Sequence, residues 1–172
     1  TIIVYTGDNG LAVGQHGLMG KQNLYEHSIR VPLIFKGPGI PKGERAAGFA
    51  YLYDIYPTLC EYAGIEIPES VEGISLKSAI ERKATHGRKA LLFAYKNFQR
   101  AVRNGDWKLI KYNVNGTVRN QLFNLGVDPY EQTDLSGDEA QAKKLEEMTA
   151  IMQKRIHDFN DDVDLAKPGW GV

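Results

Sequence analysis

Two Asn-Gly pairs, at residues 104–105 and 115–116, constrain the second half of the chain more than any other feature. Around them lie four short runs typical of strands, ALLFAY (90–95), FQRAVR (98–103), DWKLIKYN (106–113) and TVRNQLF (117–123). Asn-Gly is favoured in tight hairpins because both central positions of a type I′ turn need positive φ. These runs therefore predict an antiparallel β-meander with a hairpin at each Asn-Gly pair.

A final helix is expected after the meander. Ser136 followed by Glu139 has the spacing of a capping box. The apolar residues beyond it recur at spacings of three and four, which predicts one buried stripe: Leu145, Met148, Met152, Ile156 and Phe159.

The first half of the chain has an α/β pattern. TIIVYT (1–6) reads as a strand buried on both faces, as inside a parallel sheet, and Val31 to Phe35 reads as a second strand. A helix follows, with Asp54 as its N-cap and Gly64 as its end. Its expected buried face comprises Leu52, Ile55, Tyr56, Leu59, Cys60 and Ala63. The charged run 81–89 reads as a connection, so we expect one domain over 1–86 and another over 87–172.

Composition excludes some classes of function. The chain has 21 Lys and Arg against 21 Asp and Glu, which argues against a nucleic-acid protein with its usual basic excess. The single cysteine, Cys60, excludes an internal disulfide and is expected in the core. No apolar run is long enough to cross a bilayer.

The glycine-rich connection between the first two strands carries the candidate site residues. Asp8 and Asn9 follow the first strand, and ligands of open α/β sheets gather beyond the carboxyl ends of strands. Their oxygens suit Ca²⁺ or Mg²⁺, although Asp-Asn-Gly is also ordinary turn chemistry. His16 can pass a proton and Lys21 can neutralise an anion. The alternatives are a hydrogen-bonded loop histidine and a solvated lysine.

Five motifs in this order resemble the C-terminal half of type I sulfatases, the formylglycine-dependent branch of the alkaline phosphatase superfamily. They are TGDNG, GQHGLMGK, YEHSIRVPLIFKGPG, YDIYPTLCEYAGI and LFNLGVDPYEQTDLS. The resemblance implies the C-terminal piece of an alkaline-phosphatase-like α/β sandwich, followed by a small antiparallel subdomain with a C-terminal helix.

The resemblance also implies roles for individual residues. Asp8 and Asn9 match calcium ligands, with Mg²⁺ less expected, and Lys21 matches the lysine that holds a sulfate oxygen. His16 matches a histidine at the catalytic and substrate-binding site, whose contact is with sulfate, with the sugar or with the loop itself. Gln15 is a further candidate for substrate contact, and so is His27. Glu26 and Arg30 are expected to tie the loop down.

The nucleophile motif of the family does not occur in these residues, since Cys60 is followed by EYAG. The formylglycine and the remaining calcium ligands are therefore expected in an N-terminal half, and this chain alone should be inactive. The resemblance implies a sulfuric ester hydrolase acting on a sulfated carbohydrate, with aryl or choline sulfate also possible, in the periplasm or secreted. A phosphonate or phosphodiester hydrolase of the same superfamily and a non-catalytic, calcium-dependent glycan-binding module are the alternatives.

The meander offers two interpretations of its aromatic and basic residues. Tyr95, Arg100, Arg103 and Trp107 would line a sugar cleft, or Trp107 would pack the sheet while the arginines lie on its solvated face. Asn115-Gly116-Thr117 fits a glycosylation sequon, but the hairpin turn accounts for it.

Overall fold

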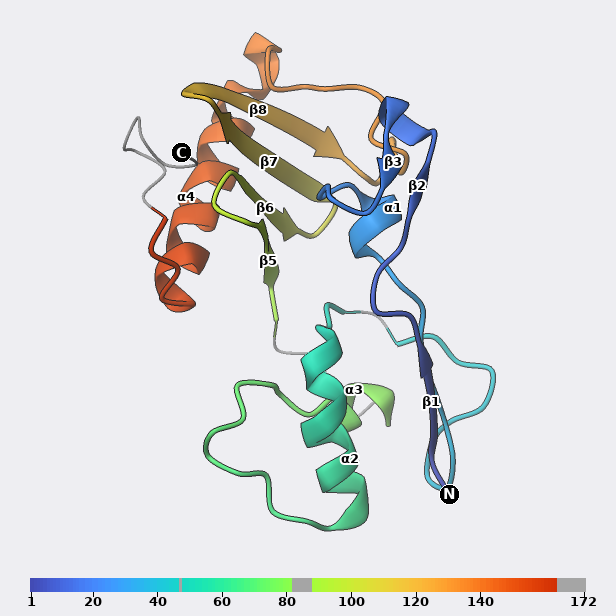
Figure 1. The fold of residues 1–172 in the computed structure, drawn as a ribbon. Coiled ribbons are helices and arrows are strands. Elements are labelled where there is room, and N and C mark those ends of the chain that lie inside the picture. The colour runs from blue at the N-terminus through green and yellow to red at the C-terminus, as the bar shows by residue number, and fades with distance from the viewer. Residues whose placement is uncertain (47, 82–87, 164–172) are drawn as a thin grey trace. The chain divides into compact units, whose positions relative to one another are not determined.

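The computed structural model describes residues 1–46, 48–81 and 88–163 (Figure 1). Two compact units share these residues: Thr1–Asp8 with Pro32–Lys89, and Asn9–Val31 with Ala90–Val172. By their contacts, residues 9–31 therefore belong to the second unit, although in the sequence they lie between two strands of the first unit. The expected domain boundary near residue 86 stays a prediction. No described helix is long and apolar enough to span a membrane.

In the first unit, strand β1 (Ile3–Thr6) pairs with β4 (Leu33–Lys36). The pairing is antiparallel, with Thr6 opposite Leu33. The expectation of a parallel arrangement is therefore wrong for these two strands, and among the described residues nothing covers Ile3 and Tyr5, which are 57% and 63% exposed. An apolar run predicts a strand but not its direction, which depends on the path of the connection. Here residues 7–32 return the chain to the same end of β1, so β4 runs antiparallel to it.

Helix α2 (Ile55–Ala63) follows the short 3₁₀ turn η2 (Leu52–Asp54) and ends at Gly64, whose φ of 66° confirms the predicted stop. The predicted buried face is partly wrong. Cys60 is buried as expected, but Tyr56 and Ala63 are exposed, and Pro57 and Thr58 are buried instead. The buried face of α2 is therefore rotated around the helix axis from the face that the spacing of its apolar residues predicts.

The Asp54 carboxylate does not cap the N–H groups of α2. It accepts hydrogen bonds from the backbone N–H of Tyr51 at 2.8 Å and of Ile74 at 2.9 Å. Arg88 binds it through two nitrogens, with Nη2 2.5 Å and Nε 3.1 Å away. The buried carboxylate thus joins the start of the helix to the segment before α3 (Lys77–Ile80).

The second unit is built on the predicted meander, which the structure confirms. Its four antiparallel strands are β5 (Ala90–Tyr95), β6 (Gln99–Asn104), β7 (Trp107–Val114) and β8 (Thr117–Asn124), paired in chain order. Asn115 and Gly116 both have positive φ, as a type I′ turn requires. At the other hairpin Asn104 pairs with Trp107, so the loop is Gly105-Asp106 and only Gly105 has positive φ.

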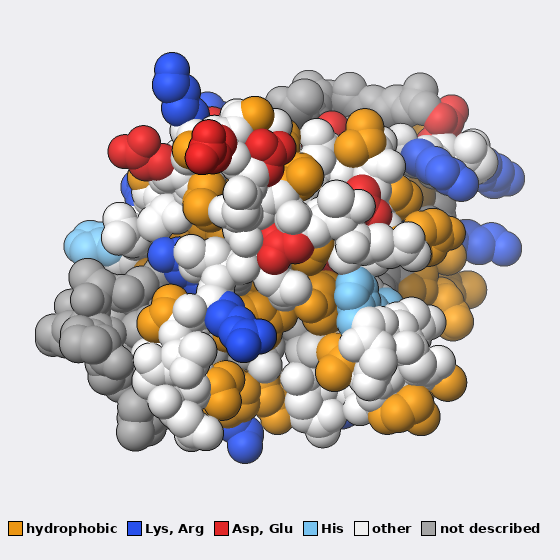
Figure 2. All heavy atoms as spheres, turned by 90° about the horizontal axis from the view of Figure 1, so that it is seen from above, with side chains coloured by type: hydrophobic (Ala, Val, Ile, Leu, Met, Phe, Trp, Pro, Cys, Tyr) orange, Lys and Arg blue, Asp and Glu red, His pale blue; other side chains and the backbone are white. Residues whose placement is uncertain are grey.

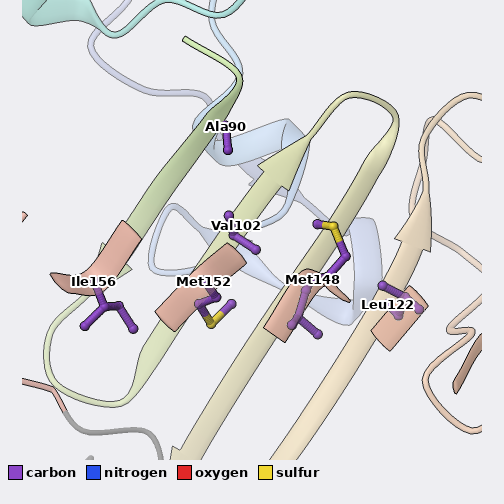
Figure 3. Close-up of a cluster of buried hydrophobic side chains, with 7 residues drawn as sticks. Ala90, Val102, Leu122, Met148, Met152 and Ile156 are labelled. Atoms are coloured by element: carbon purple, nitrogen blue, oxygen red, sulfur yellow. The ribbon is translucent and has the colours of Figure 1, made fainter. Parts of the chain in front are cut away.

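The two faces of the meander have different covers (Figure 1). Helix α4 (Ala142–Asp158) packs on one face, where its Met148, Met152 and Ile156 meet Val102 and Leu122 (Figure 3). The segment around Leu24 and Tyr25 packs on the other face, in a cluster with Ala101, Ile110 and Phe123. Both faces of this small sheet are therefore buried in the middle.

The start and end of the final helix differ from prediction. The residue that caps is Asp138, whose carboxylate accepts from the N–H of Ala140 in the 3₁₀ turn η3 (Glu139–Gln141). Ser136 instead donates to the carbonyl of Asn120, so the capping box is not formed. Phe159 lies just beyond α4 and is 37% exposed, which removes it from the predicted stripe.

Acidic and basic side chains both appear on the face shown in Figure 2, and neither sign forms one continuous area there. This distribution agrees with the equal numbers of acidic and basic residues.

Candidate functional site

The connection between β1 and β4 has regular structure of its own. Strands β2 (Ala12–Val13) and β3 (Met19–Gly20) pair with each other, and the 3₁₀ turn η1 (Gln15–Gly17) joins them. The backbone around His16 is left-handed, with φ of 101° at Gly14, 53° at His16 and 68° at Gly17. Glycine adopts such angles freely, so the two glycines allow the tight turn that presents Gln15 and His16.

The His16 ring is held on two sides. It stacks on the ring of Tyr25, with centroids 3.9 Å apart and planes at 4°. Its Nε2 lies 3.1 Å from the carbonyl oxygen of Tyr130. Because a carbonyl oxygen only accepts, Nε2 carries the proton of this bond, and Nδ1 is the ring nitrogen left for a ligand. His16 is thus a hydrogen-bonded loop histidine whose orientation is set before any ligand arrives.

His27 lies next to this stack. Its ring centroid is 5.7 Å from those of His16 and of Tyr25. Its Nε2 is buried without a hydrogen-bond partner among the described residues. Burial lowers the pKa of His27, and the nearby His16 and Lys108 lower it further. The ring is therefore expected to be neutral at pH 7.

Gln15 and Lys21 differ in what they contact. The Oε1 of Gln15 accepts from the N–H of Val13 at 2.5 Å, which occupies its carbonyl end within the hairpin. Lys21 is exposed, and its backbone N–H donates to Oε1 of Gln22 at 3.2 Å. Lys21 lies in the second unit and Asp8 in the first, so their expected pairing around one anion stays a prediction.

Asp8 and Asn9 lie one residue beyond β1, after Gly7, at the strand end where they were expected. The next residue, Gly10, donates its N–H to the carbonyl of Ser28 at 2.9 Å. A Cβ at Gly10 would lie 1.9 Å from the carbonyl oxygen of His27, so only glycine fits this close approach. A carboxylate and an amide oxygen suit Ca²⁺, but they are two donors, and the described residues contain no cluster of three His, Cys, Asp or Glu able to hold a metal.

Glu26 ties the segment to the sheet, which confirms its predicted structural role. One carboxylate oxygen lies 2.6 Å from Nη1 of Arg103, and the other lies 3.2 Å from Nζ of Lys108. Lys108 in turn lies 2.7 Å from Oε1 of Glu131, whose Oε2 accepts from the N–H of Glu26 at 2.6 Å. The side chain of Arg30 is exposed, and its backbone N–H donates to the Glu26 carbonyl. No side-chain bond of Arg30 to a described residue of the loop is observed, so its predicted role is seen in the backbone alone.

The expected sugar-binding role of the meander residues is not seen at Arg100 and Arg103. Arg100 is buried and pairs with Asp161 through two nitrogens, at 2.6 and 2.9 Å. Arg103 pairs with Glu26. The expectation that these arginines lie on a solvated face is therefore wrong, because acidic partners from distant segments neutralise them. Trp107 packs against the α4 cluster, as its structural interpretation predicted.

A cavity of about 730 Å³ opens beside His16 within the second unit. Sequence reasoning missed most of its lining, because the residues come from four separate segments. They include Tyr25, Gln99, Tyr112, Arg119, Asn120 and Gln121. The register could have indicated one part of it, since Gln99, Tyr112 and Arg119 pair across adjacent strands and share a face.

Comparison with known proteins identifies the family of the chain. Residues 14–161 match the family model described as N-sulphoglucosamine sulphohydrolase, C-terminal. The chain is 30% identical over 174 residues to N-acetylglucosamine-6-O-sulfatase of Bacteroides thetaiotaomicron, covering 94% of this chain and 31% of the relative. It is 33% identical over 169 residues to human arylsulfatase K, covering 91% of this chain and 30% of that one.

Solved structures extend the likeness to the fold. A structure in complex with its substrate D-glucosamine-2-N,6-O-disulfate superposes with a TM-score of 0.85 at 30% identity, covering 97% of this chain and 36% of that one. Phosphonate monoester hydrolase of Agrobacterium radiobacter shares the fold, with a TM-score of 0.77 at 23% identity over 92% of this chain and 35% of that one. The chain spans about a third of the length of these proteins. With the sulfatase fold thus confirmed, the chain belongs to the N-sulphoglucosamine sulphohydrolase C-terminal family.

Proposed function

We propose that the complete protein hydrolyses sulfate esters on a carbohydrate, and that this chain supplies part of its sulfate site. The family assignment supports the reaction class. Two relatives support the substrate class, one named for N-acetylglucosamine 6-O-sulfate and one solved with a sulfated glucosamine.

The observation that carries the proposal is the fixed orientation of His16. Sulfate transfer places negative charge on oxygens, and groups positioned before the reaction stabilise that charge most effectively. With Nε2 bound to Tyr130 and the ring stacked on Tyr25, Nδ1 of His16 would face a ligand without reorganisation. It would accept from a substrate hydroxyl in the neutral ring and donate to a sulfate oxygen in the protonated ring. Lys21, five residues further on, would hold a sulfate oxygen as a point charge. Gln15 would contact the substrate through its amide nitrogen.

Asp8 and Asn9 would hold calcium through one carboxylate and one amide oxygen, with further ligands from outside these residues. Bound calcium would supply a fixed positive charge at the sulfate oxygens. The formylglycine nucleophile would also come from outside these residues, so the chain by itself would be inactive. The alternating exposed side chains of Ile3, Tyr5 and Ile34 form an apolar face in the first unit, which supports packing against further protein. By family resemblance, a periplasmic or secreted location is proposed.

The decisive experiment replaces Lys21 by alanine in the complete protein. Turnover of glucosamine 6-sulfate should fall about 100-fold or more, because a charge-stabilising group is lost. Lys143→Ala, an exposed lysine on α4, is the matched control and should keep full turnover. Near-normal kinetics of Lys21→Ala would remove Lys21 from the site.

A second variant tests the metal. Asp8→Ala should lower the calcium content of the purified protein, measured by elemental analysis, because it removes the only carboxylate assigned to the ion here. Full calcium occupancy in this variant would contradict the assignment.

Turnover of different substrates distinguishes the phosphonate or phosphodiester hydrolase alternative from a sulfatase. This alternative predicts faster turnover of phenyl phosphonate esters than of sulfate esters. The glycan-binding alternative predicts calcium-dependent glycan binding with turnover of neither ester.

A further inference from the structure

The cavity beside His16 has a wall made by one row of the sheet. Gln99, Tyr112 and Arg119 are direct cross-strand neighbours on β6, β7 and β8, so their side chains emerge on the same face. Tyr25 and His16 line the same cavity from the connection between β2 and α1 (Glu26–Ile29). Its volume of about 730 Å³ lies within the range of small-molecule sites.

One amide oxygen of this cavity wall is buried without a hydrogen-bond partner among the described residues. It is Oε1 of Gln99, a residue only 8% exposed. Folded proteins pair nearly all buried polar atoms, and an exception needs an explanation. This oxygen accepts hydrogen bonds, so it suits a ligand that brings a hydroxyl or amine donor.

The remaining groups of the cavity indicate what else the ligand carries. Arg119 is exposed, and no ion pair of its guanidinium with a described residue is observed, so it is suited to an anion. The one acidic lining residue, Asp134, already accepts from the N–H of Leu122 and of Ser136.

Tyr112 provides a flat apolar surface in the cavity, whereas the ring of Tyr25 is covered by that of His16. The hydroxyl of Tyr25 donates to Oε1 of Gln121 at 2.8 Å. Burial raises the pKa of Tyr112, and the neighbouring Tyr25 raises it further, so its hydroxyl stays neutral. Neutral aromatic side chains with a polar tip are suited to the mixed apolar and polar surface of a sugar ring.

We propose that this cavity binds an anionic sugar unit adjoining the sulfated unit on which the enzyme acts. Arg119 binds its charged group, a carboxylate or a sulfate, and Oε1 of Gln99 accepts from one of its hydroxyl or amine groups. Tyr112 provides the ring contact. The assignment rests on the proposed function, because His16 lines this cavity and is also the histidine assigned above to the proposed sulfate site.

The test is a binding measurement that needs no turnover. Isothermal calorimetry on the complete protein would use three disaccharides of glucosamine, linked to glucose, to glucuronic acid or to a non-hydrolysable glucose 6-sulfonate. At least one charged disaccharide should bind about tenfold more tightly than the neutral one, which corresponds to about 1.4 kcal/mol. Tighter binding of the glucuronic acid disaccharide would identify the group bound by Arg119 as a carboxylate, and tighter binding of the sulfonate disaccharide would identify it as a sulfate. Equal affinities of the three disaccharides would overturn the proposal.

Variants assign the preference to the cavity. Arg119→Ala should abolish the preference for the charged disaccharide and leave the affinity for the neutral one unchanged. Arg119→Lys should restore part of this preference, and the control Lys143→Ala should preserve it. A preference that survives Arg119→Ala would overturn the proposal. Gln99→Leu should weaken all three disaccharides about fivefold without lowering the melting temperature, because it removes an acceptor that lacks a protein partner. Unchanged affinities with a lower melting temperature would make Gln99 merely structural and contradict its assigned contact.

The failure of this proposal is distinguishable from the failure of the proposed function. Sulfate-ester turnover unaffected by Lys21→Ala would refute the sulfate site whatever the disaccharide affinities are. Equal disaccharide affinities would refute the cavity assignment even where Lys21→Ala abolishes turnover.

Discussion

Nζ of Lys108 lies 2.7 Å from Oε1 of Glu131, and the two side chains are 0% and 1% exposed. Glu131 adopts a left-handed φ of 57°, and the preceding residue, Tyr130, offers its carbonyl to His16. The same Glu131 carboxylate accepts from the N–H of Glu26. One buried ion pair therefore connects the sheet, the segment after β8 and the loop that carries the candidate site residues.

Glu131→Gln should lower the free energy of unfolding by about 3 kcal/mol, because removing one partner of a buried pair leaves the other charge poorly compensated. Among the acidic residues that the structure describes, Lys108 would keep Glu26, at 3.2 Å. Urea denaturation monitored by circular dichroism measures the change. Glu146→Gln, on the exposed side of α4, is the control and should be neutral. A midpoint equal to that of the wild type would show that the pair is not stabilising.

Gly10→Ala should destabilise the protein by about 1–3 kcal/mol, since the new Cβ forces the backbone to shift. The shift is unavoidable because the Cβ would lie 1.9 Å from the carbonyl oxygen of His27. Gly137→Ala is a matched control, because nothing lies within 4 Å of its Cβ position. Thermal denaturation of both variants checks this, and equal melting temperatures would contradict the close approach.

The stability of the wild-type protein should fall as the pH drops below about 6.5, in part through His27. Burial, followed by the charges of His16 and Lys108, lowers the pKa of His27 from its ordinary value of 6.5. The unfolded chain then binds this proton at a higher pH than the folded protein does, so acid favours unfolding. His27→Gln should show a weaker loss of stability between pH 7.5 and 5.5 in urea titrations. An unchanged pH dependence would exclude His27 as its source.

Met148→Ala should cost about 3 kcal/mol in the free energy of unfolding, because it leaves a cavity between α4 and the sheet (Figure 3). Met148 is 0% exposed, whereas Met19 is 76% exposed, so Met19→Ala serves as the control. Chemical denaturation should separate the two variants clearly. Similar midpoints for both would mean that the helix does not pack as described.

The strands of the meander were predictable because each hairpin is a local event. Asn115-Gly116 specifies a turn through its own backbone preferences, and the alternation of the flanking strands follows from the pleat. The turn at Gly105 lies one residue later than predicted, at Gly105-Asp106, because Asn104 is the last residue of β6 and pairs with Trp107. Final-helix periodicity likewise predicted Met148, Met152 and Ile156 correctly, whereas the cap moved to Asp138 when Ser136 found the Asn120 carbonyl.

The sequence by itself determined the motif order, the local turns and the residue types available for a metal and an anion. Tertiary structure decided the rest, because ion pairs and cavity walls depend on residues far apart in the chain. Glu26 meets Lys108 across 82 positions, and His16 meets Tyr130 across 114. No local sequence pattern encodes such pairs. They form only when α4 and the segment of residues 9–31 have packed on the two faces of the sheet, because the paired charged groups are then desolvated at the same time.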